Sequence, residues 1–93
     1  MRRAARVDST QAAIVAALQA AGASVWIIGL PVDLLVGYQG RIGLMECKSL
    51  TGKLAPKPAK YTALQVEFMR TWWGPSVFTV TSPEEAIEAL ALF

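Results

Sequence analysis

The chain has 93 residues, of which 54% are hydrophobic and 17% charged, and this composition fits one small domain spanning residues 1–93. With no histidine and a single cysteine, the sequence excludes His-based zinc sites, Ser-His-Asp or Cys-His catalysis and an intrachain disulfide. The lone Cys47 is typical of a reducing compartment, so we expect a cytoplasmic protein.

The N-terminal segment 1–7 is a basic arm, followed by a predicted helix. Asp8, Ser9 or Thr10 can cap this helix, which should run to about residue 21 and end at Gly22. Capping is the role we favour for Asp8 over a catalytic one. We expect Ile14 and Leu18, together with Val15, to form its buried face.

Residues 23–28 are β-branched and aromatic and predict a first strand, which a short break at residues 29–31 separates from the next one. The longest apolar stretch, about residues 25–37, is interrupted by Pro31 and Asp33 and is shorter than the ~20 residues that span a bilayer. The N-terminal arginines are not followed by a compact apolar segment with a cleavage site. We therefore expect neither a membrane span nor a signal peptide.

Residues 31–48 predict a β-hairpin with a charged cluster at one end. If Gln39 and Gly40 form the loop, counting back along both strands places Asp33 opposite Glu46, on one face of the sheet. Lys48 follows Glu46 by two residues and shares that face. Apolar residues occupy both faces of the hairpin, as in central strands that are covered on both sides.

Two opposed carboxylates at the edge of a buried sheet repel each other unless a cation lies between them. Mg²⁺ accepts one or two carboxylates and keeps several waters, which leaves room for a phosphate oxygen. The Lys48 ammonium could then orient a water or offset charge on the phosphate. The alternative is a partly solvated ion cluster at a polar strand end.

Residues 49–61 show no periodic pattern of apolar residues and are expected to form a loop. We expect this loop and the N-terminal arm to contact a phosphate backbone. The predicted DNA-binding side chains are Arg2, Arg3, Arg6, Lys53, Lys57 and Lys60. The alternative is that both segments are simply solvated.

Thr62 and Gln65 have capping-box spacing and predict a second helix to about Trp73. Gln65 can bond back to the cap, touch the active site, or both. We expect Leu64, Phe68 and Trp72 to form the buried stripe, while Trp72 and Trp73 could alternatively stack on bases.

Residues 76–81 alternate in polarity and predict a further strand, and a second capping box at residues 82–85 opens a final helix. We expect Ile87, Leu90 and Ala91 to face inward. The order of elements predicts an α/β domain with a mixed central sheet of about four strands flanked by helices.

The Pro-Val-Asp33 segment, the Glu46-Cys47-Lys48 strand and the later helix with Gln65 resemble the PD-(D/E)XK nuclease superfamily, especially its stand-alone VRR-NUC type from phages and prophages. The resemblance covers nearly the whole chain and implies a restriction-endonuclease-like core in the cytoplasm of a bacterial host. It implies Mg²⁺ or Mn²⁺ held by Asp33, Glu46 and the backbone carbonyl of Cys47, with Asp33, Glu46, Lys48 and Gln65 catalytic. The family often carries a glutamate on the first helix, where this chain has Ala13, with Gln11 nearby.

The expected function is a metal-dependent DNA endonuclease that is selective for a Holliday junction or other branched DNA. The alternatives are a non-catalytic nucleic-acid-binding module that retains the fold, and a structural subunit of a larger complex. The high apolar content also predicts that a partner covers part of the surface, most simply a second copy in a homodimer.

Overall fold

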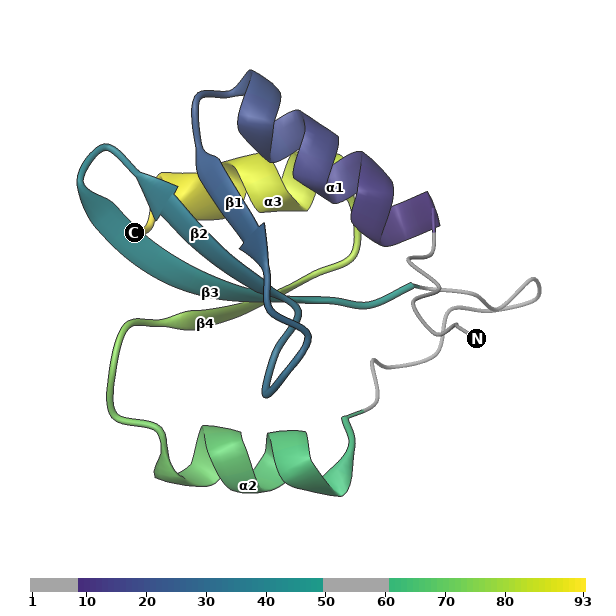
Figure 1. Ribbon diagram of the computed structural model, residues 1–93, viewed down its shortest axis with the longest axis vertical. Coiled ribbons are helices and arrows are strands. Elements are labelled where there is room, and N and C mark those ends of the chain that lie inside the picture. The colour runs from purple at the N-terminus through teal and green to yellow at the C-terminus, as the bar shows by residue number, and fades with distance from the viewer. Residues whose placement is uncertain (1–8, 50–60) are drawn as a thin grey trace.

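The computed structural model describes residues 9–49 and 61–93 (Figure 1). These residues form three helices and four strands, which follow one another as α1 (Ser9–Ala20), β1 (Ser24–Ile27), β2 (Leu34–Tyr38), β3 (Arg41–Cys47), α2 (Ala63–Thr71), β4 (Val77–Val80) and α3 (Pro83–Leu90). Asp8, the arginines of the arm and the three loop lysines lie outside the described residues, so their roles stay predictions.

The four strands form one mixed sheet in the order β1-β2-β3-β4, in which β3 and β4 are parallel and the other neighbours antiparallel. The β2–β3 turn has two residues, Gln39 and Gly40, with φ of 51° and 80°, as a tight hairpin turn of this kind requires. Tyr38 pairs with Arg41, and the register continues to Leu34 opposite Met45. The predicted α/β class, mixed sheet and hairpin register are all confirmed.

The hydrophobic core lies on the face of the sheet that α1 and α3 cover (Figure 1). Leu34, Val36 and Met45 point to this face and are 0% exposed. Ile14 and Leu18 of α1 are buried against them, as the sequence predicts. Each such side chain contributes roughly 1.5–3 kcal/mol when fully removed from water, so this layer is the main source of the fold's stability.

The end of α1 turns the chain into β1 through a glycine. Gly22 has φ of 99° and donates its N–H to the carbonyl of Gln19, while the N–H of Ala23 bonds to the carbonyl of Leu18. This pair of bonds is a Schellman motif, in which a left-handed residue satisfies the last helical carbonyls. The predicted stop at Gly22 is confirmed.

The inward face of α3 differs from the expected one. Ala86, Ala89 and Leu90 are buried, whereas Ile87 is 45% exposed and Ala91 is also exposed. The prediction was wrong for Ile87 and Ala91 because the helix meets the core through its small alanines, which rotates the buried stripe by one position. Ser82 caps α3 by accepting a bond from the N–H of Glu85, as expected.

The helix α2 lies on the side of the sheet opposite α1 and α3 (Figure 1). It has the predicted capping box but ends at Thr71, with Trp72 as its C-cap. Within α2, Gln65 is the one buried residue, so the predicted stripe is wrong: Leu64 is 53% exposed and Trp72 41%. Phe68 and Met69, one turn along from Gln65, are only partly buried, so the face of α2 that is nearest the sheet is centred on an amide side chain.

The far end of α2 is also separated from the sheet by a hollow. A cavity of about 310 Å³ lies between the helix end and the start of β4, lined by Met69, Trp72, Gly74, Pro75, Ser76 and Val77. The indole N–H of Trp72 bonds to the carbonyl of Pro75 at 2.7 Å, which folds this ring back over the turn. The apolar residues of α2 therefore pack on each other and on this turn more than on the sheet.

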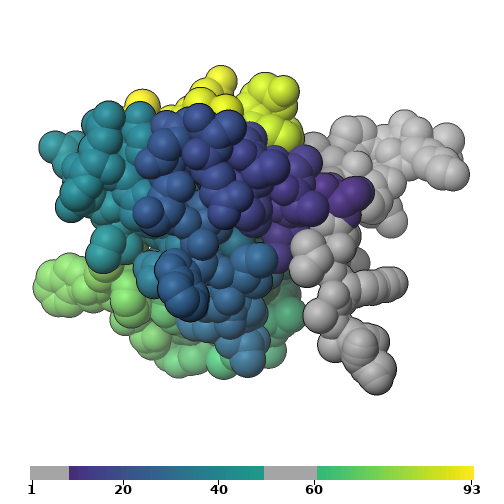
Figure 2. All heavy atoms as spheres, turned by 45° about the horizontal axis from the view of Figure 1, so that its top comes forward, coloured from purple at the N-terminus to yellow at the C-terminus, as the bar shows by residue number. Residues whose placement is uncertain are grey.

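In the space-filling view of Figure 2, β1 and the residues after it form the surface between α1 and α2. This position agrees with an edge strand, and Trp26 and Ile27 are 72% and 55% exposed. None of the described helices is long and apolar enough to cross a membrane.

Replacement of Glu85 tests the α3 cap. The carboxylate of Glu85 accepts bonds of 2.7 Å from both the N–H and the hydroxyl of Thr81, which lowers its pKa from the ordinary value of 4.5. A lowered folded-state pKa gives stability that is present above 4.5 and lost as the pH falls through the folded pKa. We expect Glu85→Gln to be less stable than wild type at neutral pH, with a difference that shrinks at acidic pH.

Urea unfolding at neutral pH and below pH 4.5 measures this difference. Glu84→Gln, in the same helical turn, is the matched control for loss of a first-turn charge. A difference that stays constant with pH would contradict the cap assignment.

Candidate active site

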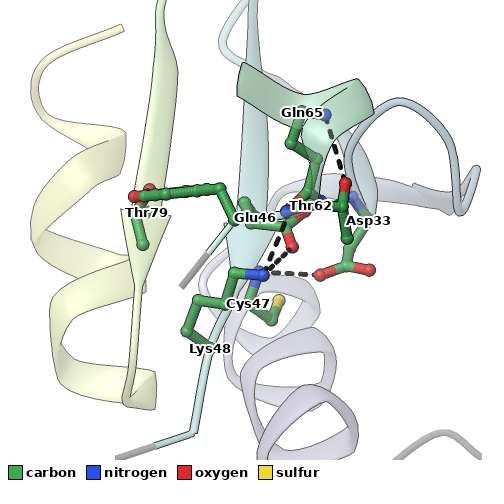
Figure 3. A network of polar contacts seen from close by, with 8 residues as sticks. Asp33, Glu46, Cys47, Lys48, Thr62, Gln65 and Thr79 are labelled. Atoms are coloured by element: carbon green, nitrogen blue, oxygen red, sulfur yellow. Dashed lines mark hydrogen bonds and ion pairs between the residues drawn. The ribbon is translucent and has the colours of Figure 1, made fainter. Parts of the chain in front are cut away.

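Three polar side chains form a row on the sheet face opposite the core. Glu46 lies near the end of β3, and Thr79 of β4 is its partner in the parallel register. Asp33 precedes β2 by one residue, at the position where the hairpin register continues opposite Glu46. Figure 3 shows Asp33 and Thr79 on the two sides of Glu46. The sequence predicts the pairing of Asp33 with Glu46 but not that of Glu46 with Thr79.

Hydrogen bonds with backbone N–H groups hold Asp33 at the open end of the hairpin, away from its turn. Its carbonyl accepts bonds from the N–H groups of Ile28 and Gly29, at 2.8 and 3.2 Å, and thereby closes the loop between β1 and β2. Its carboxylate oxygen Oδ2 accepts a 2.8 Å bond from the N–H of Cys47. The carboxylate of Asp33 therefore lies against the end of β3.

Glu46 is 3% exposed, and each of its carboxylate oxygens has a donor. Oε1 accepts a 3.2 Å bond from the N–H of Asp33, and Oε2 is 2.9 Å from the Nζ of Lys48. The predicted cluster of Asp33, Glu46 and Lys48 is thus present. A buried ion pair is weak support for stability because desolvation offsets the attraction between the charges.

The pKa of Asp33 is raised above its ordinary value of 3.8, mainly because burial disfavours its charged form. The N–H of Cys47 acts in the opposite direction by stabilising the carboxylate. The charge of Glu46 and a hydrogen bond shared with its carboxyl group raise the pKa further, and Lys48 lowers it. Burial and the neighbouring Glu46 charge thus both disfavour the ionised form of Asp33, a cost that a divalent cation between the two side chains would offset.

Gln65 bonds back to its helix cap and also contacts Lys48. Its side-chain Oε1 accepts a 3.1 Å bond from the N–H of Thr62, which closes the capping box, and a 3.3 Å bond from the Nζ of Lys48. Figure 3 shows Gln65 reaching from α2 toward the side chains of Glu46 in β3 and of Lys48 just after it. The first turn of α2 is therefore part of the site.

The start of α1 also lies near the end of β3. The hydroxyl of Ser49, next to Lys48, donates a 3.0 Å bond to the hydroxyl of Thr10. Ala13, at the position where a family glutamate is expected, is exposed, and Gln11 is partly exposed. Neither residue supplies a carboxylate to the site.

The donor set fits a hard divalent cation that keeps most of its water. The described parts of the chain contain no group of three or more histidine, cysteine or acidic side chains that could hold a metal. The Asp33 and Glu46 carboxylates are, however, the one or two acidic ligands that Mg²⁺ ordinarily takes from a protein, with waters and phosphate oxygens completing the shell. Cys47, whose backbone carbonyl is the expected third ligand, follows Glu46 in the chain, and its N–H bonds to the Asp33 carboxylate.

Two residues of the site were not predicted from the sequence. The hydroxyl groups of Tyr61 and Thr79 are 2.6 Å apart, and the Lys48 Nζ lies 5.3 Å from the centre of the Tyr61 ring. Thr79 could be found only from the parallel register of β3 and β4, which no turn defines. The position of Tyr61 immediately before the Thr62 cap was the available signal.

Comparison of the chain with known protein families, with curated proteins and with solved structures finds no match. The functional argument therefore depends on the site.

Metal binding through the two carboxylates is testable by stability alone. We expect Mg²⁺ or Mn²⁺ to stabilise the protein because a ligand at about ten times its Kd adds about 1.4 kcal/mol to the free energy of unfolding. For a domain of this size, that raises Tm by several degrees. Thermal unfolding with and without metal should show this rise in wild type and its loss in Asp33→Asn and Glu46→Gln.

Glu67→Gln is the matched control, because this carboxylate pairs with Arg70 on the exposed side of α2. A metal-induced rise that survives in both site variants would place the cation elsewhere.

Proposed function

We propose that the chain is a metal-dependent DNA endonuclease. The observation that carries the proposal is the pair of the partly buried Asp33 and the buried Glu46, with the Lys48 Nζ 2.9 Å from Glu46, all near the end of β3. A burial-raised carboxyl pKa beside a specific charged partner is typical of functional sites. The arrangement combines cation ligands with a positive donor, as hydrolysis of a phosphodiester requires.

The metal would be Mg²⁺ or Mn²⁺, held by Asp33, Glu46 and the backbone carbonyl of Cys47. It would supply charge neutralisation at the scissile phosphate and a water of lowered pKa. The restricted exposure of Glu46, at 3%, would keep bulk water from competing for its carboxylate.

Lys48 would act on the substrate directly. Its side chain is 19% exposed, so the ammonium can reach a phosphate at the surface while staying close to Glu46. An ammonium placed there would orient the attacking water and stabilise the negative charge that develops on the phosphate. Gln65 would hold this ammonium in place through its 3.3 Å bond and complete the set of catalytic residues.

The spacing of Asp33, Glu46, Lys48 and Gln65 supports a place in the PD-(D/E)XK superfamily, among stand-alone VRR-NUC proteins of phages and prophages. On that likeness the substrate is duplex or branched DNA, including the Holliday junction, in the cytoplasm of a bacterial host. The basic segments 1–7 and 50–60 would contact its backbone.

Cleavage of labelled DNA tests the function. We expect Mg²⁺- or Mn²⁺-dependent cleavage that EDTA abolishes and that Lys48→Ala lowers at least about 100-fold, as for other donors that stabilise transition-state charge. A four-way junction, a flap and a linear duplex, compared at equal concentration, rank the substrates. Arg70→Ala removes an exposed cation of α2 and is the matched control.

No cleavage by wild type in any metal, alongside salt-sensitive DNA binding, would leave the non-catalytic binding module. That alternative is favoured by one observation, the absence of a carboxylate at Gln11 and Ala13 on α1. A protein without salt-dependent affinity for DNA would instead fit a structural subunit.

We also propose that the protein acts as a homodimer. The sheet face that carries the site has exposed apolar side chains on neighbouring strands: Trp26 is 72% exposed, its register partner Leu35 37% and Ile42 55%. Contiguous exposed apolar residues of this size are typical of an interaction surface. Two-fold pairing of this surface would present two sites to related strands of a symmetric DNA.

Sedimentation velocity tests the dimer. Trp26→Glu should shift wild-type dimers to monomers, since it places a charge in the apolar surface. Leu92→Glu is the matched control, because Leu92 is 70% exposed and follows α3 on the other side of the sheet. A wild-type monomer, or equal effects of the two variants, would contradict this assignment.

A further inference from the structure

Tyr61 links the start of α2 to the edge strand of the sheet. It immediately precedes Thr62, the N-cap of α2, and its hydroxyl is 2.6 Å from that of Thr79 in β4. Thr79 is the register partner of Glu46, so it lies next to Glu46 on the sheet, on the side away from Asp33 (Figure 3). This contact therefore joins the loop end of α2 to the row of polar residues that forms the site.

The ring of Tyr61 also lies next to the catalytic ammonium. The Nζ of Lys48 is 2.9 Å from Glu46 Oε2, 3.3 Å from Gln65 Oε1 and 5.3 Å from the centre of the Tyr61 ring. An ammonium within about 6 Å of an aromatic face is attracted by the ring quadrupole. Lys48 is thus contacted by Glu46 of β3, by Gln65 of α2 and by Tyr61, which precedes the N-cap of α2.

Apolar packing does little to place the first turn of α2. Gln65 is the residue of α2 that is buried, while Leu64 and Val66 beside it are 53% and 55% exposed. The position of Gln65 over Lys48 therefore depends on polar contacts, among which the Tyr61–Thr79 hydrogen bond joins the segment before the helix to β4. Loss of this bond should let the helix start move relative to Lys48.

We propose that Tyr61 and Thr79 form a positioning pair, which holds the Lys48 ammonium and the Gln65 amide in the geometry needed for phosphodiester cleavage. The inference deepens the proposed nuclease function and depends on it. Neither residue is expected to touch the reacting atoms. Their effect should appear in the rate of the bound complex and not in the affinity for DNA.

The experiment measures single-turnover cleavage at saturating DNA and metal by Tyr61→Phe, Thr79→Val and the double variant. Each single variant removes one hydroxyl of the same hydrogen bond and should lower the rate about 3- to 10-fold, with DNA binding unchanged. The double variant should be no slower than either single one, because both remove the same contact. Tyr38→Phe and Thr71→Val are matched hydroxyl-removal controls, since Tyr38 packs against the core and Thr71 bonds within α2.

A second measurement follows Lys48 without reference to activity. With ¹³C-labelled lysine, the ε-methylene resonance of Lys48 should show a ring-current shift that Tyr61→Leu removes and Tyr38→Leu leaves in place. Additive rate losses, or losses equal to those of the controls, would overturn the positioning role. A Lys48 resonance that does not change in Tyr61→Leu would overturn the contact between Lys48 and the Tyr61 ring.

These experiments distinguish failure of the nuclease proposal from failure of the positioning proposal. A wild-type protein that cleaves no DNA in any metal overturns the nuclease function, and the positioning role with it. A wild type that cleaves, with Tyr61→Phe and Thr79→Val at the same rate, overturns the positioning pair alone.

Discussion

The candidate site depends on the close approach of two carboxylates, of which Glu46 is buried and Asp33 is partly buried. Asp33 and Glu46 face each other where the hairpin opens, and burial together with their mutual repulsion raises the pKa of Asp33. Lys48 and the N–H of Cys47 offset part of this cost. A protein selected for stability alone gains little from such a cluster, since apolar residues of similar volume would serve as well. The cost is understandable if the cluster binds a cation and a phosphate.

One strand supplies both the core and the site. In β3, Met45 points to the α1 and α3 side and is 0% exposed, while its neighbour Glu46 points to the opposite face. A shift of one residue in the β2–β3 register would put Glu46 into the core and Met45 into the site. The two-residue turn at Gln39 and Gly40 sets this register, so a turn at the other end of the hairpin determines which side chains form the acidic pair.

Local signals explain what could be predicted from the sequence. The capping box at Thr62, the N-cap at Ser82, the stop at Gly22 and the pairing of Asp33 with Glu46 each follow from residues close together in the chain or across one tight turn. The buried faces of α2 and α3 and the contact between Tyr61 and Thr79 depend on how distant elements pack. Parallel pairing of β3 with β4 has no hairpin turn to fix its register, so Thr79 could not be placed beside Glu46 in advance.

The arrangement around Gln65 couples helix formation to the chemistry of the site. A single oxygen, Oε1, accepts both the N–H of Thr62, which closes the first turn of α2, and the ammonium of Lys48. A helix start is ordinarily the part of a helix that opens most readily, and here its surrounding apolar residues are exposed. When that turn opens, Lys48 loses the Gln65 oxygen as a partner and keeps the Glu46 carboxylate. Order at the start of α2 therefore determines whether the Lys48 ammonium is shared between Gln65 and Glu46 or paired with Glu46 alone.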